Sequence, residues 1–258
     1  MTAGTVLGMR AAREPIDVLE PGSVDYRTAW DQQRAIAAAR IADTGPDTLI
    51  LLEHPSVYTA GRRTQPTDLP RDGSPVIEVD RGGRITWHGP GQLVAYPIVL
   101  LAERMNLTGY VRLLEQALIA TCADFDVDTM RVAGRSGVWL PAAGGRPERK
   151  IAAIGVHVAR GVTSHGVALN CNPDLTAFDR IVPCGISDAG VTSLSAELGT
   201  EITVHDALPR LRHWMCEALD GRLPIRKEAV RAVLAEPSGG PASDNGVSWE
   251  LAPSLLGG

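Results

Sequence analysis

Apolar residues recur every three to four positions in several stretches of the chain, which is the spacing of an amphipathic helix. Asp25 and Thr108 precede or begin two of these stretches, where a short polar side chain can cap the first turn. Gly45 and Pro46 end the first stretch. The pattern predicts three long helices and one short helix, at residues 26–42, 108–125, 204–219 and 193–198.

Other stretches are short apolar runs or alternate between apolar and polar residues, which is typical of strands. They are residues 16–19, 48–52, 76–79, 85–87, 93–99, 129–132, 137–140, 150–159 and 162–169. Most of the strands follow one another through hairpin turns, such as the one at Arg160 and Gly161. This order is typical of the α+β class. We therefore predict a mixed, largely antiparallel sheet with helices packed on one face.

The stretch at residues 81–97, RGGRITWHGPGQLVAYP, is more elaborate than a hairpin needs. Its four glycines allow positive φ angles and a close approach of the backbone to a ligand. Trp87, His88 and Gln92 bring an apolar wall, a titratable ring and an amide into one loop, which are the components of a small-molecule pocket. A glycine-rich surface loop is the alternative interpretation.

Composition narrows the classes of function. The chain has 258 residues, of which 44% are hydrophobic, and a net charge of −5, which suits a large core and disfavours nucleic-acid binding. No apolar run is long enough to span a membrane, and the N-terminus lacks the apolar core of a signal peptide, so we expect a cytoplasmic protein that does not bind membranes. The four cysteines show no C-x-x-C spacing, and we predict no disulfide framework and no metal site.

Cys184 and Lys150 are the candidates for chemistry. Of the 25 basic residues only Lys150 and Lys227 are lysines, and a lysine amine can exchange protons whereas an arginine cannot. Cys184 lies between Pro183 and Gly185 in an open turn, and its thiol needs a positive neighbour to ionise well below its usual pKa of about 8.5. A buried, inert cysteine and an unrelated surface lysine remain the alternative.

The remaining polar and sulfur-containing candidates are interpreted as structural. His54, beside Pro55, is read as a polar turn residue, and His157 and His165 as hydrogen-bonded residues of strands. The three other cysteines are expected to pack in the interior: Cys122, Cys171 and Cys216.

Several motifs, in a fixed order, resemble those of the lipoyl(octanoyl) transferases. Besides RGGRITWHGPGQLVAYP they are GSVDYRTAWDQQ, LEHPSVYTAGR, KIAAIGVHV, SHGVALNCNPDL and IVPCGISDAGVTSL, and together they extend over residues 22–219. The resemblance implies a fold similar to that of lipoate and biotin protein ligases. It also divides the chain into an N-terminal extension (1–22), a catalytic domain (23–235) and a C-terminal tail (236–258), which we expect to be disordered.

The family moves an octanoyl group from octanoyl-acyl carrier protein to a lysine of a lipoyl domain, in the first step of endogenous protein lipoylation, without a cofactor. The acceptors are lipoyl domains of 2-oxo acid dehydrogenase complexes and the glycine cleavage H protein. The resemblance implies that Cys184 forms a thioester with the acyl group and that Lys150 lowers the pKa of this thiol. The implied substrate-binding residues are Arg81, Gly82, Gly83, Arg84, Ile85, Thr86, Trp87, His88, Ala153, Ile154, Gly155, Gly166, Val167 and Ala168.

Two other functions fit the same fold. An ATP-dependent lipoate or biotin ligase would need adenylate contacts and no thioester, and the chain has no G-x-x-x-x-G-K-[ST] motif. A non-catalytic module would only dock the acyl carrier or lipoyl domains. For the docking module, and for the transferase, a basic patch is expected to meet an acidic partner, formed by Arg62, Arg63, Arg146 and Arg149.

Overall fold

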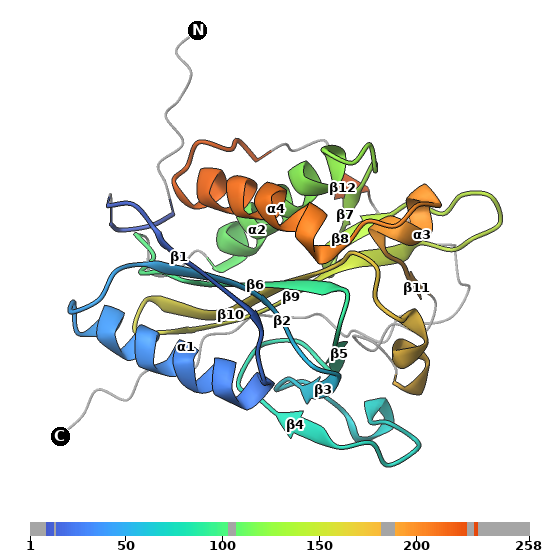
Figure 1. The fold of residues 1–258 in the computed structure, drawn as a ribbon, viewed down its shortest axis with the longest axis horizontal. Coiled ribbons are helices and arrows are strands. Elements are labelled where there is room, and N and C mark those ends of the chain that lie inside the picture. Colours follow the sequence, from blue (N-terminus) through green and yellow to red (C-terminus); the bar gives the residue numbers. More distant parts are fainter. Residues whose placement is uncertain (1–8, 13, 103–106, 182–188, 226–229, 232–258) are drawn as a thin grey trace, which may run out of the picture.

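Helices cover both faces of a central mixed sheet (Figure 1). The computed structural model describes residues 9–12, 14–102, 107–181, 189–225 and 230–231. The segment with Cys184, and the predicted tail 236–258, lie outside these residues. The helices are α1 (Tyr26–Ile41), α2 (Leu107–Ala123), α3 (Leu194–Leu198) and α4 (Val204–Leu219), with short 3₁₀ turns η1 (Pro66–Asp68) and η2 (Leu175–Arg180).

Among the described residues, nine strands form the main sheet. Along the sheet their order is β1 (Asp17–Ser23), β2 (Thr48–Glu53), β6 (Gln92–Ile98), β10 (Val162–Asn170), β9 (Arg149–Ala159), β8 (Arg135–Leu140), β7 (Met130–Val132) and β12 (Val230–Arg231), with β11 (Gly190–Val191) beside β9. The pairs β1–β2, β7–β12 and β9–β11 are parallel and the others antiparallel. The predicted fold class is therefore confirmed.

A small second sheet carries the glycine-rich loop. Its order is β4 (Val76–Glu78), β3 (Val57–Ala60) and β5 (Thr86–His88). The β5 strand pairs antiparallel with β3, and four residues later the chain enters the main sheet as β6. The glycine-rich stretch therefore connects the small sheet, through β5, to the main sheet, through β6.

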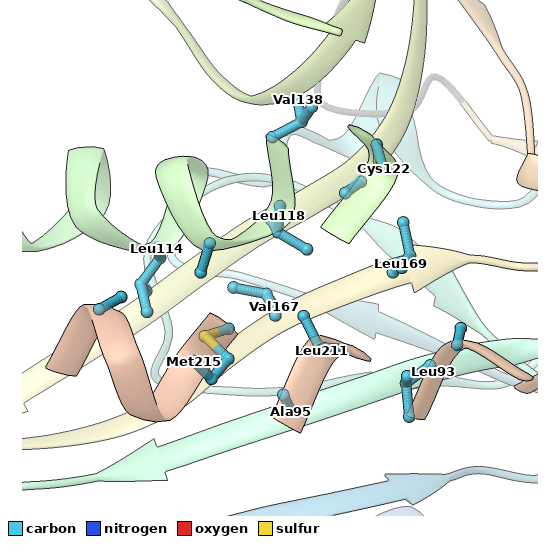
Figure 2. Close-up of a cluster of buried hydrophobic side chains, with 14 of the residues drawn as sticks. Leu93, Ala95, Leu114, Leu118, Cys122, Val138, Val167, Leu169, Leu211 and Met215 are labelled. Carbon is cyan, nitrogen blue, oxygen red and sulfur yellow. The ribbon is translucent and has the colours of Figure 1, made fainter. Parts of the chain in front are cut away.

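Both faces of the main sheet are buried, because successive residues of its central strands are apolar. In β2, Leu49 and Leu51 pack with α2 and α4, whereas Ile50 and Leu52 pack against α1. Figure 2 shows the first of these cores, in which Leu114 and Met215 of the two helices meet over β6 and β10. The prediction that all helices lie on one face was wrong. Sequence periodicity shows that a helix has an apolar face but not which side of a doubly buried sheet it covers.

Most predicted element boundaries agree with the structure within one or two residues. Asp25 accepts a hydrogen bond from Thr28 N at 3.1 Å and caps α1, and Ser193 caps α3 in the same way. Thr108 does not cap α2, because this helix already includes Leu107. Residues 17–22, predicted to belong to an extension, form most of β1 at the edge of the main sheet.

Candidate active site

The three predicted substrate-binding segments meet in the structure. Residues 153–155 of β9 pair with residues 166–168 of β10 across an antiparallel ladder. The loop 81–88 lies against β9, where Gly82 N donates a hydrogen bond to Val156 O at 2.9 Å. Segments up to 87 residues apart in the sequence thus lie side by side.

Glycines make this close packing possible. A Cβ atom on Gly155 would lie 2.8 Å from Arg81 Cδ, and one on Gly166 would lie 2.1 Å from Ala95 O. Within the loop, only Gly83 and Gly91 have positive φ angles, and Gly89 instead leaves room for the ring of Trp87. Gly82 and Gly89, also expected to use positive φ, do not, and of these two only Gly89 is needed for steric reasons.

Arg81 fixes the shape of the loop. Its guanidinium is buried and donates hydrogen bonds to Arg84 O at 2.8 Å, to Gly82 O at 3.1 Å, and to both Thr59 O and Thr59 Oγ1 at 2.8 Å. These bonds join the loop to β3. The Arg81 side chain thus ties the loop backbone to the neighbouring strand.

Ile85 and Trp87 belong to an apolar cluster next to the segment that contains Cys184. Trp87 packs edge-to-face on Phe178, with ring centroids 5.5 Å apart, and its indole donates to Ser56 Oγ at 2.9 Å. Ile181, the last described residue before position 184, is part of the same cluster. An acyl chain held near this cluster would find an apolar wall already formed.

Lys150 is buried where β10 ends and β11 takes its place beside β9. Its side chain is held over the indole face of Trp139, with Nζ 4.6 Å from the ring centroid, and its carbonyl accepts a hydrogen bond from Thr192 N at 2.9 Å. The strand β11 begins six residues after Cys184. Cys184 itself is outside the described residues, so its contact with Lys150 stays a prediction.

A cluster of buried rings lies behind the loop. His54 is fully buried, donates from Nδ1 to Val24 O at 2.6 Å and accepts at Nε2 from the hydroxyl of Tyr96 at 2.8 Å. The prediction that His54 is only a polar turn residue was wrong, since these two bonds hold it in the interior. Tyr26 stacks on His88, with centroids 5.8 Å apart. Burial lowers the pKa of His54. Burial, together with the charges around the ring, lowers the pKa of His88 to about 3.

The other structural assignments hold in part. His165 is buried and its Nε2 donates to Asp80 Oδ1 at 2.7 Å, as predicted for a hydrogen-bonded strand residue. Cys122 and Cys171 are fully buried, and burial raises the pKa of each thiol to about 12. Cys216 is half-buried beside the core.

Sequence reasoning missed Trp139, Tyr26 and Asn170, which the structure brings to the site. Asn170 ends β10 and is buried, with Oδ1 2.8 Å from Gln92 Nε2. An amide directly after the apolar run 167–169 is a signal that was available in the sequence.

The predicted basic patch does not form as expected. Arg149 is buried and donates from Nε and Nη2 to the carboxylate of Glu197, at 2.6 Å each, and from Nη1 to Pro141 O at 2.8 Å. Arg146 is exposed and reaches the same carboxylate at 3.3 Å. Arg62 and Arg63 are exposed. A patch for an acidic partner therefore cannot include Arg149.

An open groove of about 1100 Å³ adjoins the loop at Trp87, Pro90 and Gly91. It is bordered by Trp87, Pro90, Gly91 and residues of β3, β4 and η2, and Lys150 does not line it. Among the described residues no group of three His, Cys, Asp or Glu side chains is placed to hold a metal ion, and no helix there is long and apolar enough to cross a membrane.

Comparison with known proteins identifies the family. Residues 25–215 match the family described as lipoyl protein ligase A/B catalytic domain. An octanoyltransferase of Mycobacterium avium (strain 104) is 60% identical over 227 residues, which cover 88% of this chain and 97% of the relative. An octanoyltransferase of Rhodococcus opacus (strain B4) is 59% identical over 228 residues, covering 87% and 88%. The chain belongs to this family of octanoyltransferases.

The resemblance stated from the motifs is thereby confirmed, and with it the enzyme class, since an octanoyltransferase is an acyltransferase. Solved structures agree with the fold. A bi-partite lipoate protein ligase from Thermoplasma acidophilum superimposes with a TM-score of 0.60 at 13% identity, over 86% of this chain and 89% of that one. A lipoate-protein ligase A bound with ATP gives 0.55 at 12% identity, over 86% and 90%.

Proposed function

We propose that this octanoyltransferase works through a thioester on Cys184, with octanoyl-acyl carrier protein as donor and a lipoyl-domain lysine as acceptor. The acceptors would be lipoyl domains of 2-oxo acid dehydrogenase complexes and the glycine cleavage H protein, and the reaction would take place in the cytoplasm. The observation that carries the proposal is the burial of Lys150 beside β11, because this strand begins six residues after Cys184. The chain is also 60% identical to a named octanoyltransferase.

In the first step the Cys184 thiolate attacks the carbonyl carbon of the donor thioester. The bond from this carbon to the carrier's sulfur breaks, and the departing thiolate takes a proton from the Lys150 ammonium. In the second step the acceptor amine attacks the Cys184 thioester, an amide forms, and the Cys184 thiolate leaves. The neutral Lys150 amine takes the proton that the attacking nitrogen loses, which restores the starting state.

The surroundings of Lys150 suit both proton transfers. The indole face of Trp139 contacts the ammonium group and stabilises its charged form. Residues 81–88, 153–155 and 166–168 lie side by side, and Ile85 and Trp87 among them offer an apolar wall for the acyl chain. Burying an eight-carbon chain yields about 0.8 kcal/mol per CH₂, enough to select for chain length.

Intact-mass measurement after incubation with octanoyl-acyl carrier protein tests the proposal. We expect one octanoyl adduct that is removed by hydroxylamine, forms without ATP, and is lost in Cys184→Ala. Cys171→Ser is the matched control and should keep the adduct, because the thiol of Cys171 is buried. An adduct that persists in Cys184→Ala, or that forms only with ATP, would overturn the thioester mechanism.

A further inference from the structure

His88 is joined to the backbone near Lys150 by a chain of buried hydrogen bonds. Its Nδ1 lies 2.6 Å from Gln92 Oε1, and Gln92 Nε2 lies 2.8 Å from Asn170 Oδ1. Asn170 Nδ2 in turn lies 2.9 Å from Thr192 O, and Thr192 N donates to Lys150 O. The three side chains of this chain are all buried.

The hydrogen bond between Asn170 and Thr192 O fixes which atom donates in each of the side-chain hydrogen bonds. A backbone carbonyl can only accept, so the atom of Asn170 that faces Thr192 O must be its NH₂ group. Its Oδ1 then accepts from the NH₂ group of Gln92, which also points at Trp87 O, 3.5 Å away. Gln92 therefore presents its oxygen to His88, and Nδ1 of His88 must carry the proton.

Nε2 of His88 is consequently an acceptor with a lone pair. No hydrogen bond joins this nitrogen to a residue in the described ranges, yet it is not among the buried polar atoms that lack a partner there. The ring is held by Tyr26, stacked at 5.8 Å, and by His54, edge-on at 5.8 Å. The lone pair is thus fixed in direction, on a residue that keeps only 7% of its surface exposed.

The electrostatic surroundings keep this ring neutral. Burial is the main cause of its low pKa, and the positive charge available on His54 and on Arg81 adds to it. The groups around it come from four elements and the loop: Tyr26 of α1, His54 after β2, Tyr96 of β6, His165 of β10 and Arg81. None offers a carboxylate to the ring. His88 is therefore poorly suited to accept a proton, but well suited to accept a hydrogen bond.

We propose that His88 Nε2 accepts a hydrogen bond from an N–H group of a substrate, and that Gln92 and Asn170 are positioning residues that fix this tautomer. This proposal rests on the proposed function, which supplies two such groups. One is an amide N–H of the carrier's phosphopantetheine arm, and the other is the amine of the acceptor lysine. A protonated Nε2 would repel either group.

Nitrogen NMR of the histidine rings in the resting protein tests the tautomer without any substrate. We expect the wild-type protein to show Nδ1–H and an unprotonated Nε2 for His88, unchanged between pH 5 and pH 9. In Gln92→Leu, which removes the acceptor for Nδ1–H, the Nε2–H form should appear. In Gln92→Glu, which keeps an oxygen there, the Nδ1–H form should remain. Nε2–H in the wild-type protein would overturn the proposal, whether or not Cys184 forms a thioester.

The two half-reactions identify the substrate group. Formation of the octanoyl adduct involves the carrier, and transfer from the isolated adduct involves the acceptor. We expect Gln92→Leu to slow the half-reaction whose substrate donates to Nε2 on the order of tenfold, the effect of losing one buried hydrogen bond. Gln92→Glu should be affected less. If the tautomer changes in Gln92→Leu and both half-reactions keep their wild-type rates, no substrate N–H binds at His88.

Discussion

At the scale of single residues, the site depends on how Lys150 is held. An ammonium group buried without a partner is costly, and the indole face of Trp139 at 4.6 Å offers an uncharged partner. Arg135 lies over the same ring at 5.7 Å, so the indole contacts two cations. The ring of Trp139 thus helps to fix the position of the Lys150 side chain.

Replacing Trp139 tests this arrangement. We expect Trp139→Leu to lower the rate of octanoyl transfer about tenfold, because a desolvated cation–π contact is worth about 1–2 kcal/mol. Trp139→Phe, which keeps an aromatic face, should lose less. Trp214→Leu is the control on α4, where the indole donates to Asp124. Equal losses in folded Trp139→Leu and Trp139→Phe proteins would show that the ring face is not what matters.

At the scale of elements, two glycines set the distance between strands and loop. A Cβ on Gly166 would meet backbone of β6 at 2.1 Å in the middle of the sheet, where neither strand can move away. A Cβ on Gly155 would meet the Arg81 side chain at 2.8 Å. The first substitution acts on the sheet, the second on the loop.

We therefore expect Gly166→Ala to prevent folding or to destabilise the protein by several kcal/mol, within the range of overpacked cores. Gly155→Ala should fold but displace the loop, raising KM for the donor about tenfold. Gly190→Ala is the control, since its Cβ would lie 3.5 Å from the nearest atom. Thermal melting and steady-state kinetics give both readouts. A Gly166→Ala protein as stable as the wild type would contradict this steric account.

The ion pair of Arg149 and Glu197 joins β9 to α3. The hydrogen bonds from Arg149 are the main cause that lowers the pKa of Glu197 to about 2 from its usual 4.5. A carboxyl group whose pKa is lowered on folding stabilises the folded state above its unfolded pKa. This contribution is lost as the pH falls from about 4.5 towards 2.

Glu197→Gln should therefore lower the free energy of unfolding at pH 7 by about 2 kcal/mol, since a buried guanidinium loses its counter-charge. Between pH 4.5 and pH 2 the difference from the wild type should shrink. Glu217→Gln removes a more exposed partner of Arg222 and should cost under 1 kcal/mol. Denaturant titrations at several pH values measure this. A difference between Glu197→Gln and wild type that is independent of pH would contradict it.

At the scale of the whole molecule, a buried ion network connects the layers. Asp47 accepts from Arg10 at 3.0 Å and from Arg40, near the end of α1, at 2.8 Å. Arg10 also pairs with Asp220, the residue that caps the C-terminus of α4. Asp47 thus links Arg10 to α1, and Arg10 in turn links Asp47 to the end of α4 on the opposite face of the sheet.

Asp47→Asn should destabilise the protein by about 3 kcal/mol and lower Tm by about 6–12 °C, because two buried guanidinium groups each lose the buried one of their two charge partners. Asp43→Asn is the matched control. Asp43 pairs with Arg40 at 2.8 Å but is exposed, so we expect a change below 1 kcal/mol. Thermal unfolding compares the two variants. Equal Tm values for both would show that the network does not hold the layers together.

The sequence predicted the elements well, because local periodicity and capping residues such as Asp25 determine them. The substrate-binding role of the three segments stays a prediction from the resemblance, and the structure shows that they lie side by side and that Gly155 and Gly166 allow this close packing. The sequence did not predict that α1 covers the opposite face from α2 and α4, or that Arg149 is buried on Glu197. It also missed the interior position of His54 and the contact of Trp139 with Lys150. These features depend on contacts between residues distant in sequence, which no local pattern encodes.

The central claim is that Lys150 ionises Cys184 and exchanges protons during transfer. The rate of Cys184 alkylation by iodoacetamide as a function of pH tests it most directly, in a Cys216→Ser background. Cys122 and Cys171 will not interfere, because burial raises the pKa of each to about 12. The account predicts a midpoint well below the free-thiol pKa of about 8.5 in the wild type, and a rise in Lys150→Ala.

Lys150→Arg separates charge from proton exchange in the same measurement. Because arginine keeps the charge but does not release a proton, the alkylation midpoint should stay low while transfer to the acceptor lysine is strongly impaired. The account is contradicted if the midpoint of Cys184 alkylation is the same in wild type and Lys150→Ala.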